Sequence, residues 1–273
     1  MPAQRTDTLT LGEGAFARTL ALRILDAQDG NSLPQLVWLG GYRSDMTGTK
    51  AVELEAHAAA TGAACLRFDY SGHGASSGRF TDGTISLWLE DALAVIAHAG
   101  GPRMVLVGSS MGGWIALRLV EELRRRGEGH RIAGLVLIAP APDFTAALIE
   151  PQLTEAQQLS LNERGYFEEP TPYGPDANVF TKALLDDGRQ NLVLTGMIET
   201  DCPVHILQGM EDPDVPYMHA ITLMEHLVCD DVVMTLIRDG DHRLSRPQDI
   251  EKMKEAIAAV CAHAPNAGIS TPK

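Results

Sequence analysis

The pentapeptide G-S-S-M-G at residues 108–112 has the residue types and spacing that most directly indicate a chemical reaction. It follows an apolar run at residues 104–107 and precedes a helix-like stretch at residues 114–123. In a G-x-S-x-G turn between a strand and a helix, the serine takes a strained backbone conformation and its hydroxyl is exposed at the helix N-terminus. The motif therefore predicts Ser110 as a nucleophile.

A second copy of the pattern, G-A-S-S-G, occupies residues 74–78. It follows the turn-like sequence S-G-H-G rather than an apolar strand, and the residues after it do not begin a helix. Ser76 is therefore predicted to be a loop residue. Asp69, Ser71 and the neighbouring glycines are predicted to shape that loop, and His73 is not expected to bind a metal.

A serine hydroxyl becomes a good nucleophile only when a base removes its proton, and histidine is the usual base. His242, in the sequence D-G-D-H-R at residues 239–243, follows the last predicted strand. The C-terminal ends of parallel strands lie along one edge of a sheet, so His242 is expected to approach Ser110 there. The other histidines lie in helical patterns, in a strand or in turns and loops.

A carboxylate must orient that histidine, and the loop at residues 209–216 contains three candidates. This loop follows the preceding predicted strand and opens on the same sheet edge. Asp212 and Asp214 both suit the role, and Glu211 is a remote third. Asp214 equally suits a turn or a helix cap before Tyr217, so the residues alone leave the choice open.

The negative oxygen of a tetrahedral intermediate needs two preorganised N–H donors. The backbone N–H of Met111, directly after the serine, is predicted as one donor. The second is predicted in the G-G-Y sequence at residues 40–42, where glycine lets the backbone approach a ligand. Tyr42 N–H is the first choice and Gly41 N–H the second.

Short, continuous apolar runs indicate the buried strands that must position these loops. They cover residues 36–39, 63–68, 104–107, 132–138, 204–207 and 232–237, and an alternating run at 20–25 indicates a half-buried strand near a sheet edge. Helical patterns at 50–60, 85–99, 114–126 and 249–263 lie between or after them. The alternation predicts an α/β fold with a mostly parallel central sheet and helices on both faces.

The segment at residues 140–200 interrupts this alternation. It contains Phe144, Leu148, Leu153, Tyr166 and Phe167 among many acidic residues. Long loops in compact domains are usually functional, so we expect an inserted helical cap that covers the site with apolar side chains, with an ordinary surface excursion as the alternative. Residues 1–273 are expected to form a single domain that carries this insertion.

Composition excludes several classes of partner. The 22 Lys and Arg against 36 Asp and Glu give a net charge of −14, which opposes binding to nucleic acid or to an anionic membrane. No apolar run approaches the roughly 18 residues of a membrane span. The first 17 residues contain no apolar signal region, which predicts a cytoplasmic enzyme. The four cysteines form no C-x-x-C pair, so neither a disulfide framework nor a zinc site is expected.

Several motifs together resemble the α/β-hydrolase superfamily. They are G-Y-R-S-D-M-T-G-T-K-A at 41–51, R-F-D-Y-S-G-H-G at 67–74, G-S-S-M-G-G-W at 108–114, L-Q-G-M-x-D-x-x-V-P at 207–216 and D-H-R at 241–243. They look like the branch that contains a mitochondrial palmitoyl-protein thioesterase, which also cleaves acyl glucuronides. The resemblance implies the α/β-hydrolase fold and the chain order serine, acid, histidine. It also selects Asp212, because the acid loop of the superfamily has the form G-x-x-D-x-x-V-P.

Residues and resemblance together predict a serine hydrolase that cleaves carboxylic esters or thioesters through an acyl-enzyme on Ser110, with Asp212 and His242 completing the triad. No cofactor or metal is expected. The predicted substrate is a small-molecule acyl ester or thioester, or an acylated protein. Arg43 is expected to pair with Asp45 or another nearby acid rather than with a substrate carboxylate. The alternatives are an acyltransferase or amidase with the same triad, and a non-catalytic ligand-binding scaffold.

Overall fold

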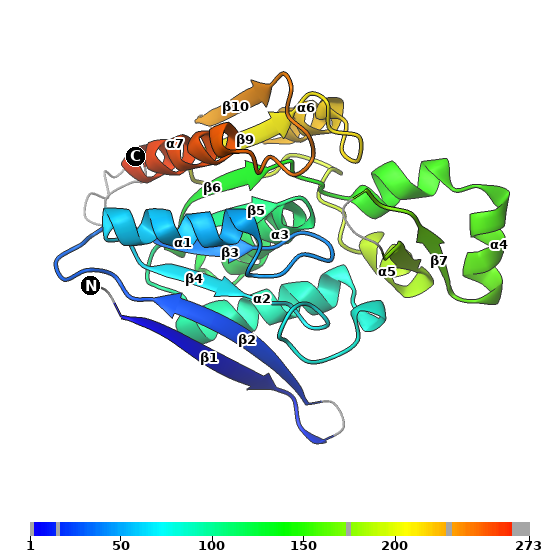
Figure 1. Ribbon diagram of the computed structural model, residues 1–273, viewed down its shortest axis with the longest axis horizontal. Coiled ribbons are helices and arrows are strands. Elements are labelled where there is room, and N and C mark those ends of the chain that lie inside the picture. The colour runs from blue at the N-terminus through cyan, green and yellow to red at the C-terminus, as the bar shows by residue number, and fades with distance from the viewer. Residues whose placement is uncertain (1–2, 15–16, 173–175, 228–230, 264–273) are drawn as a thin grey trace.

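The computed structural model describes residues 3–14, 17–172, 176–227 and 231–263, and its centre is an eight-stranded sheet (Figure 1). The strands, in order across the sheet, are β1 (Gln4–Leu11), β2 (Arg18–Leu25), β4 (Cys65–Phe68), β3 (Gln35–Leu39), β5 (Met104–Ser109), β6 (Ile132–Ile138), β9 (Val204–Gly209) and β10 (Val232–Ile237). β2 pairs antiparallel with β1 and with β4, and every other neighbouring pair is parallel. The mostly parallel α/β architecture predicted from the sequence is therefore confirmed.

Helices cover both faces of this sheet. α1 (Thr49–Thr61) and α7 (Pro247–His263) lie on one face, and α2 (Ile85–Ala99), α3 (Met111–Arg125) and α6 (Tyr217–His226) lie on the other (Figure 1). Successive side chains of β3 enter the two cores in turn, because neighbouring side chains of a strand point to opposite faces. Two buried faces explain the continuous apolar runs. Over the described ranges, none of the helices is both long and apolar enough to cross a bilayer.

The two edge strands differ from expectation. No strand is predicted at β1. Its mostly polar side chains are exposed or half-buried, and Leu9 and Leu11 pack against the core. β10 is predicted to be fully buried, and this prediction is wrong, since Val233 and Leu236 are 46% and 40% exposed. An edge strand has a neighbour on one side only, so its side chains are less completely covered.

Between β6 and β9 the chain leaves the sheet and forms a segment beyond the C-terminal ends of the parallel strands, on the right in Figure 1. Its elements are a π-helical turn (Thr145–Ile149), a 3₁₀ turn (Glu150–Gln152), α4 (Glu155–Glu163), the antiparallel pair β7 (Tyr166–Glu169) and β8 (Asn178–Thr181), and α5 (Lys182–Gly188). The helices agree with expectation, but no strand is predicted here. Each strand is only four residues long and contains no apolar run; the register pairs Phe167 with Phe180, and both are buried.

A buried carboxylate fastens the two ends of this segment together. Asp143, near its start, accepts backbone N–H bonds from Val193 (2.9 Å) and Leu194 (2.8 Å), near its end. Burial raises the pKa of this carboxyl above its ordinary value, while the two N–H donors favour its ionised form. Trp114 of α3 donates from Nε1 to the carbonyl of Asn191 (2.9 Å). The segment is thus joined to the helix that follows Ser110.

Candidate active site

Ser110 stands at the turn between β5 and α3 with φ 55° and ψ −119°, a strained conformation for a residue with a side chain. The flanking glycines give this turn the space that it needs. A Cβ on Gly112 would lie 2.0 Å from the carbonyl oxygen of Leu39, and a Cβ on Gly108 would lie 2.5 Å from that of Gly112. Met111 is the first residue of α3, where backbone N–H groups have no acceptor within the helix.

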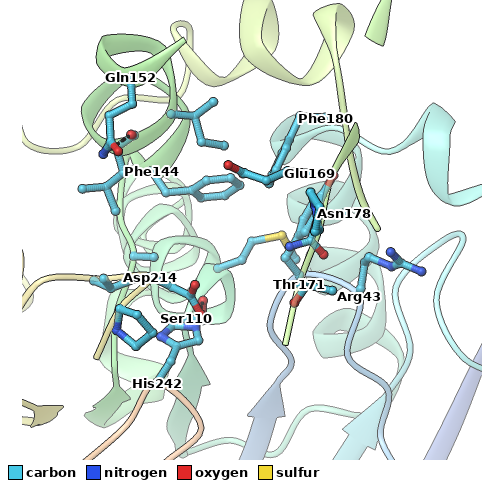
Figure 2. A pocket seen from close by; sticks show the side chains of 18 of the residues that line it. Arg43, Ser110, Phe144, Gln152, Glu169, Thr171, Asn178, Phe180, Asp214 and His242 are labelled. Atoms are coloured by element: carbon cyan, nitrogen blue, oxygen red, sulfur yellow. Dashed lines mark hydrogen bonds between the residues drawn. The ribbon is translucent and has the colours of Figure 1, made fainter. Parts of the chain in front are cut away.

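His242 and Asp212 continue a chain of hydrogen bonds that begins at Ser110. His242 Nε2 lies 3.1 Å from Ser110 Oγ (Figure 2), and His242 Nδ1 lies 2.8 Å from Asp212 Oδ2. A carboxylate only accepts, so Nδ1 carries the proton and Nε2 faces the hydroxyl as an acceptor. The Asp212 side chain is 0% exposed and that of His242 is 17% exposed. Such a chain can remove the proton of a serine hydroxyl that attacks a carbonyl.

The loops that bring His242 and Asp212 together are bonded to each other. β9 and β10 run parallel, and their register pairs Gly209 with Ile237 at the ends of the two strands. Beyond this pair, Met210 N–H donates to the Ile237 carbonyl and Glu211 N–H donates to the Gly240 carbonyl, both at 2.9 Å. The loop that carries Asp212 (residues 209–216, the acid loop) and the loop that carries His242 (residues 239–243) are therefore joined by hydrogen bonds where they leave the sheet.

Among the three acids considered for the triad, Asp212 contacts His242 Nδ1 at 2.8 Å. Its second oxygen, Oδ1, accepts backbone N–H bonds from Asp214 (2.9 Å) and Val215 (2.8 Å). Asp214 is exposed and lines the cavity described below, and Glu211 is also exposed. The geometry thus favours the same aspartate as the motif resemblance.

Gly41 and Tyr42 lie in the loop after β3, against the turn at Ser110. A Cβ on Gly41 would lie 3.3 Å from the Cβ of Ser110, so the backbone of this loop approaches the serine closely. The Tyr42 side chain points to the segment between β6 and β9: its hydroxyl donates to the Val179 carbonyl, and its ring stacks on Phe180 with centroids 5.3 Å apart. Burial raises the pKa of the Tyr42 phenol, which keeps it a donor.

Ser76, in the second pentapeptide, is hydrogen-bonded within a loop. Its Oγ donates to the Asp69 carbonyl (2.6 Å) and accepts from Ala21 N–H (2.9 Å). The Asp69 carboxylate in turn accepts N–H bonds from Met46 (2.7 Å) and Ala75 (2.8 Å). These bonds connect four separate backbone segments, so the motif here has a structural role.

His73 lies in an aromatic cluster rather than in a group of metal ligands. Its ring centroid is 5.1 Å from that of Phe80 and 5.2 Å from that of Trp88, and Tyr42 packs on the same two rings. Its Nδ1 lies 3.3 Å from the Ser71 carbonyl, and its buried Nε2 has no partner in the part of the chain that the structure describes. Burial lowers the pKa of His73 to about 4, so the ring is neutral near pH 7.

A cavity of about 510 Å³ adjoins Ser110 and His242 (Figure 2). Its apolar lining residues are Met111, Ala141, Phe144, Leu148, Ile149, Leu153, Phe167, Pro170, Pro172, Phe180, Pro213 and Val215. Four of the five apolar residues expected over the site thus line it, whereas Tyr166 instead packs its ring under the Arg164 guanidinium. The cavity also has a polar lining that was not predicted from the sequence; it includes Arg43, Gln152, Gln157, Glu169, Thr171, Asp176 and Asn178.

Arg43 belongs to this polar lining, and its expected pairing with Asp45 is replaced by contacts across the cavity. Its guanidinium donates to the carbonyls of Asp176 and Ala177 and lies 4.0 Å from the Asp176 carboxylate. The Asp45 carboxylate instead accepts from the N–H and hydroxyl of Thr47. The loop that contains Tyr42 and Arg43 is therefore bonded to the chain at residues 176–179.

One group among the described residues has the ligand types and spacing for a metal ion. The ligand atoms of Asp212, Asp214 and His242 lie within 4.8 Å of one another. However, Asp212 Oδ2 and His242 Nδ1 already bond to each other, and Asp212 Oδ1 holds two backbone N–H groups. A metal at Asp212 would have to compete with these bonds, so the donor set fits a hydrogen-bonded chain better than a metal site.

Comparison with known proteins places this chain in a family. Residues 30–260 match the model of the alpha/beta hydrolase family, and the chain belongs to that family. The protein is therefore a hydrolase by family, and the resemblance inferred from its motifs is confirmed. Within the family it is similar to palmitoyl-protein thioesterase ABHD10 of mouse, a mitochondrial protein by name, with 30% identity over 218 residues that cover 80% of this chain and 71% of ABHD10.

Solved structures give the same result. A putative hydrolase from Agrobacterium vitis S4 is 58% identical, with a TM-score of 0.91 over 95% of this chain and 99% of its own. Mouse alpha/beta hydrolase domain-containing protein 10 is 28% identical, with a TM-score of 0.79 over 93% of this chain and 98% of its own. Both support the α/β-hydrolase fold derived above.

The expected cytoplasmic location is contradicted by these relatives. The human, mouse and orangutan (Pongo abelii) proteins that match this chain are all named mitochondrial. The expectation depended on the composition of the first 17 residues alone, and such a local pattern is a weak indicator of where an enzyme works.

Proposed function

We propose that this hydrolase is a serine hydrolase that cleaves carboxylic esters or thioesters through an acyl-enzyme on Ser110. The observation that carries the proposal is the unbroken chain from Ser110 Oγ through His242 to the buried Asp212, at 3.1 Å and 2.8 Å. The strained φ of 55° at Ser110 supports it, because backbone strain of this kind is retained at sites where the side chain must be presented.

In the proposed mechanism, His242 Nε2 takes the proton of Ser110 as Oγ attacks the carbonyl carbon. Asp212 holds the imidazole in the right tautomer and stabilises its positive charge. The backbone N–H groups of Met111 and Tyr42, or of Gly41 in place of Tyr42, stabilise the oxyanion. His242 then gives its proton to the leaving group. A water molecule, deprotonated by His242, attacks the acyl-enzyme, and His242 returns that proton to Ser110 Oγ as the acyl group leaves as a carboxylic acid. No step requires a cofactor or a metal.

We also propose that residues 140–200 act as a cap on a single catalytic domain. Phe144, Leu148, Leu153 and Phe167 present apolar surface to the cavity beside Ser110, which favours an acyl chain. The name of the ABHD10 relatives, palmitoyl-protein thioesterase, supports long-chain acyl thioesters as one substrate class. The acyl group would come from a small molecule or from an acylated protein.

Labelling with a fluorophosphonate, followed by peptide mapping, tests the nucleophile. Ser110 should be modified and Ser76 should not, because Ser110 Oγ lies 3.1 Å from His242 Nε2, whereas Ser76 Oγ is bonded to the Asp69 carbonyl and to Ala21 N–H. Ser110→Ala should abolish both labelling and hydrolysis of octanoyl thioesters, whereas Ser76→Ala serves as the matched control in the second pentapeptide. Label on Ser76, or none on the native protein, would contradict the proposal and favour a non-catalytic scaffold.

A further inference from the structure

Gln208 is a buried polar residue of the sheet that the mechanism above does not use. It lies in β9, directly before the acid loop, and it is 0% exposed. Its Nε2 donates toward three acceptors: the carbonyls of Gly209 (3.1 Å) and Val215 (3.0 Å) and the Oδ2 of Asp212 (3.2 Å). Because all three neighbours accept, the amide nitrogen rather than its oxygen must face them.

The other end of this amide has no such partner. Gln208 Oε1 is buried and makes no hydrogen bond to the residues that the structure describes. An unsatisfied buried oxygen opposes folding, and an apolar side chain in the middle of a hydrophobic sheet would avoid that cost. Stability therefore does not explain why a glutamine stands at this position. The contacts that its amide nitrogen makes with the loop at residues 209–216 do.

The bonds to Asp212 divide between its two oxygens. Oδ1 is held by the backbone N–H groups of Asp214 and Val215, whereas Oδ2 is shared by Gln208 Nε2 and His242 Nδ1. With only Oδ1 fixed, the carboxylate could rotate and draw Oδ2 away from the imidazole. The bond from Gln208 also holds Oδ2. With both oxygens held, the carboxylate can no longer rotate about its Cβ–Cγ bond.

We infer that Gln208 is a positioning residue of the triad: it fixes the carboxylate plane of Asp212 and, through it, the orientation of His242 toward Ser110. This inference depends on the proposed function. Gln208 touches no substrate; it acts only through Asp212.

Gln208→Met tests the inference, because methionine fills a similar volume without donors. The kcat for octanoyl thioester hydrolysis should fall by roughly 10- to 100-fold, the range for losing one hydrogen bond to a charged group, with KM close to the wild-type value. The acid limb of the kcat/KM profile should move to lower pH, because a carboxylate that is free to turn away from the imidazole stabilises the imidazolium of His242 less. Gln208→Asn keeps a buried amide but moves it one methylene away from Asp212, so kcat and the acid limb should change in the same way as in Gln208→Met. This second variant keeps the test available if the methionine variant does not fold.

Gln35→Met is the matched control. Gln35 is also a buried glutamine of the sheet, 7% exposed, and it bonds the backbone of Ala99 and Gly101, away from the triad. Its substitution should lower stability without moving the acid limb. Wild-type kcat and an unmoved acid limb in folded Gln208→Met or Gln208→Asn would overturn the inference. An active Ser110→Ala variant would instead overturn the proposed function, so the two failures are distinguishable.

Discussion

Acid should destabilise this protein through His73, and the size of the effect follows from its burial. His73 is 3% exposed, the rings of Tyr70, Phe80 and Trp88 pack around it, and its Nε2 has no partner among the described residues. A charged imidazole cannot be solvated there, which lowers the pKa of His73 from 6.5 to about 4. The same aromatic cluster supports Tyr42, so its disruption would also reach the active site.

The sign of the effect follows from which state binds the proton. As the pH falls through 6.5 the unfolded chain takes up a proton on His73, whereas the folded protein does so only near pH 4. Between these values the unfolded state binds more protons, so the free energy of unfolding decreases as the pH falls. At about 1.4 kcal/mol per pH unit, the loss reaches roughly 3 kcal/mol by pH 4 and then levels out.

Urea unfolding, followed by tryptophan fluorescence between pH 7 and pH 4, measures this loss. His73→Asn removes this titrating imidazole. Between pH 7 and pH 4, the free energy of unfolding of the variant should therefore decrease by roughly 3 kcal/mol less than that of the wild type. His205 and His219, whose pKa values burial also lowers, titrate in both proteins and cancel in the difference. His130→Asn, at an exposed position, controls for the loss of a histidine as such. Equal acid dependence in the wild type and His73→Asn would refute the argument.

Further predictions concern the reaction. His242→Ala should lower kcat by several orders of magnitude in a folded protein, measured by steady-state hydrolysis with circular dichroism as the folding control. Asp212→Asn should be more damaging than Asp214→Asn, because Asp212 Oδ2 lies 2.8 Å from His242 Nδ1; the reverse order in the same assay would show that Asp214 is the acid. In a thioester panel, kcat/KM should rise by about fourfold per methylene until the cavity is full, since each buried methylene contributes about 0.8 kcal/mol, and equal rates for acetyl and octanoyl substrates would contradict the apolar pocket. EDTA should leave hydrolysis of the octanoyl substrate unchanged, and a loss of activity that Zn²⁺ restores would redirect attention to the ligand atoms of Asp212, Asp214 and His242.

The sequence was most informative where structure follows from local physics. The inner strands β3, β5, β6 and β9 are buried on both faces, and burial on both faces produces continuous apolar runs that can be recognised without a structure. The turn at Ser110 is equally local, because Gly108 and Gly112 are required by contacts within a few residues and with the adjacent strand. The parallel order of the strands then predicts which loops share an edge.

The sequence was least informative where a residue is defined by a distant partner. β7 and β8 are too short and polar to produce a pattern, and they pair with each other across the chain between them. Arg43 was expected to bind a neighbour in the sequence, but it bonds Asp176 and Ala177, more than 130 positions away. Gln208 reads as one more residue of a buried strand until its amide is seen beside Asp212.

By itself, then, the sequence determined the α/β alternation, the serine turn and the loops that carry a histidine and three acids. Tertiary structure decided which atoms meet: His242 reaches Ser110 across 132 positions, and Asp212 rather than Asp214 faces the imidazole. It also decided that the cavity has a polar wall beside its apolar one. Backbone propensity and side-chain periodicity act within a few residues, whereas a hydrogen bond between loops depends on how the strands beneath them are ordered and aligned, and no local pattern encodes that alignment.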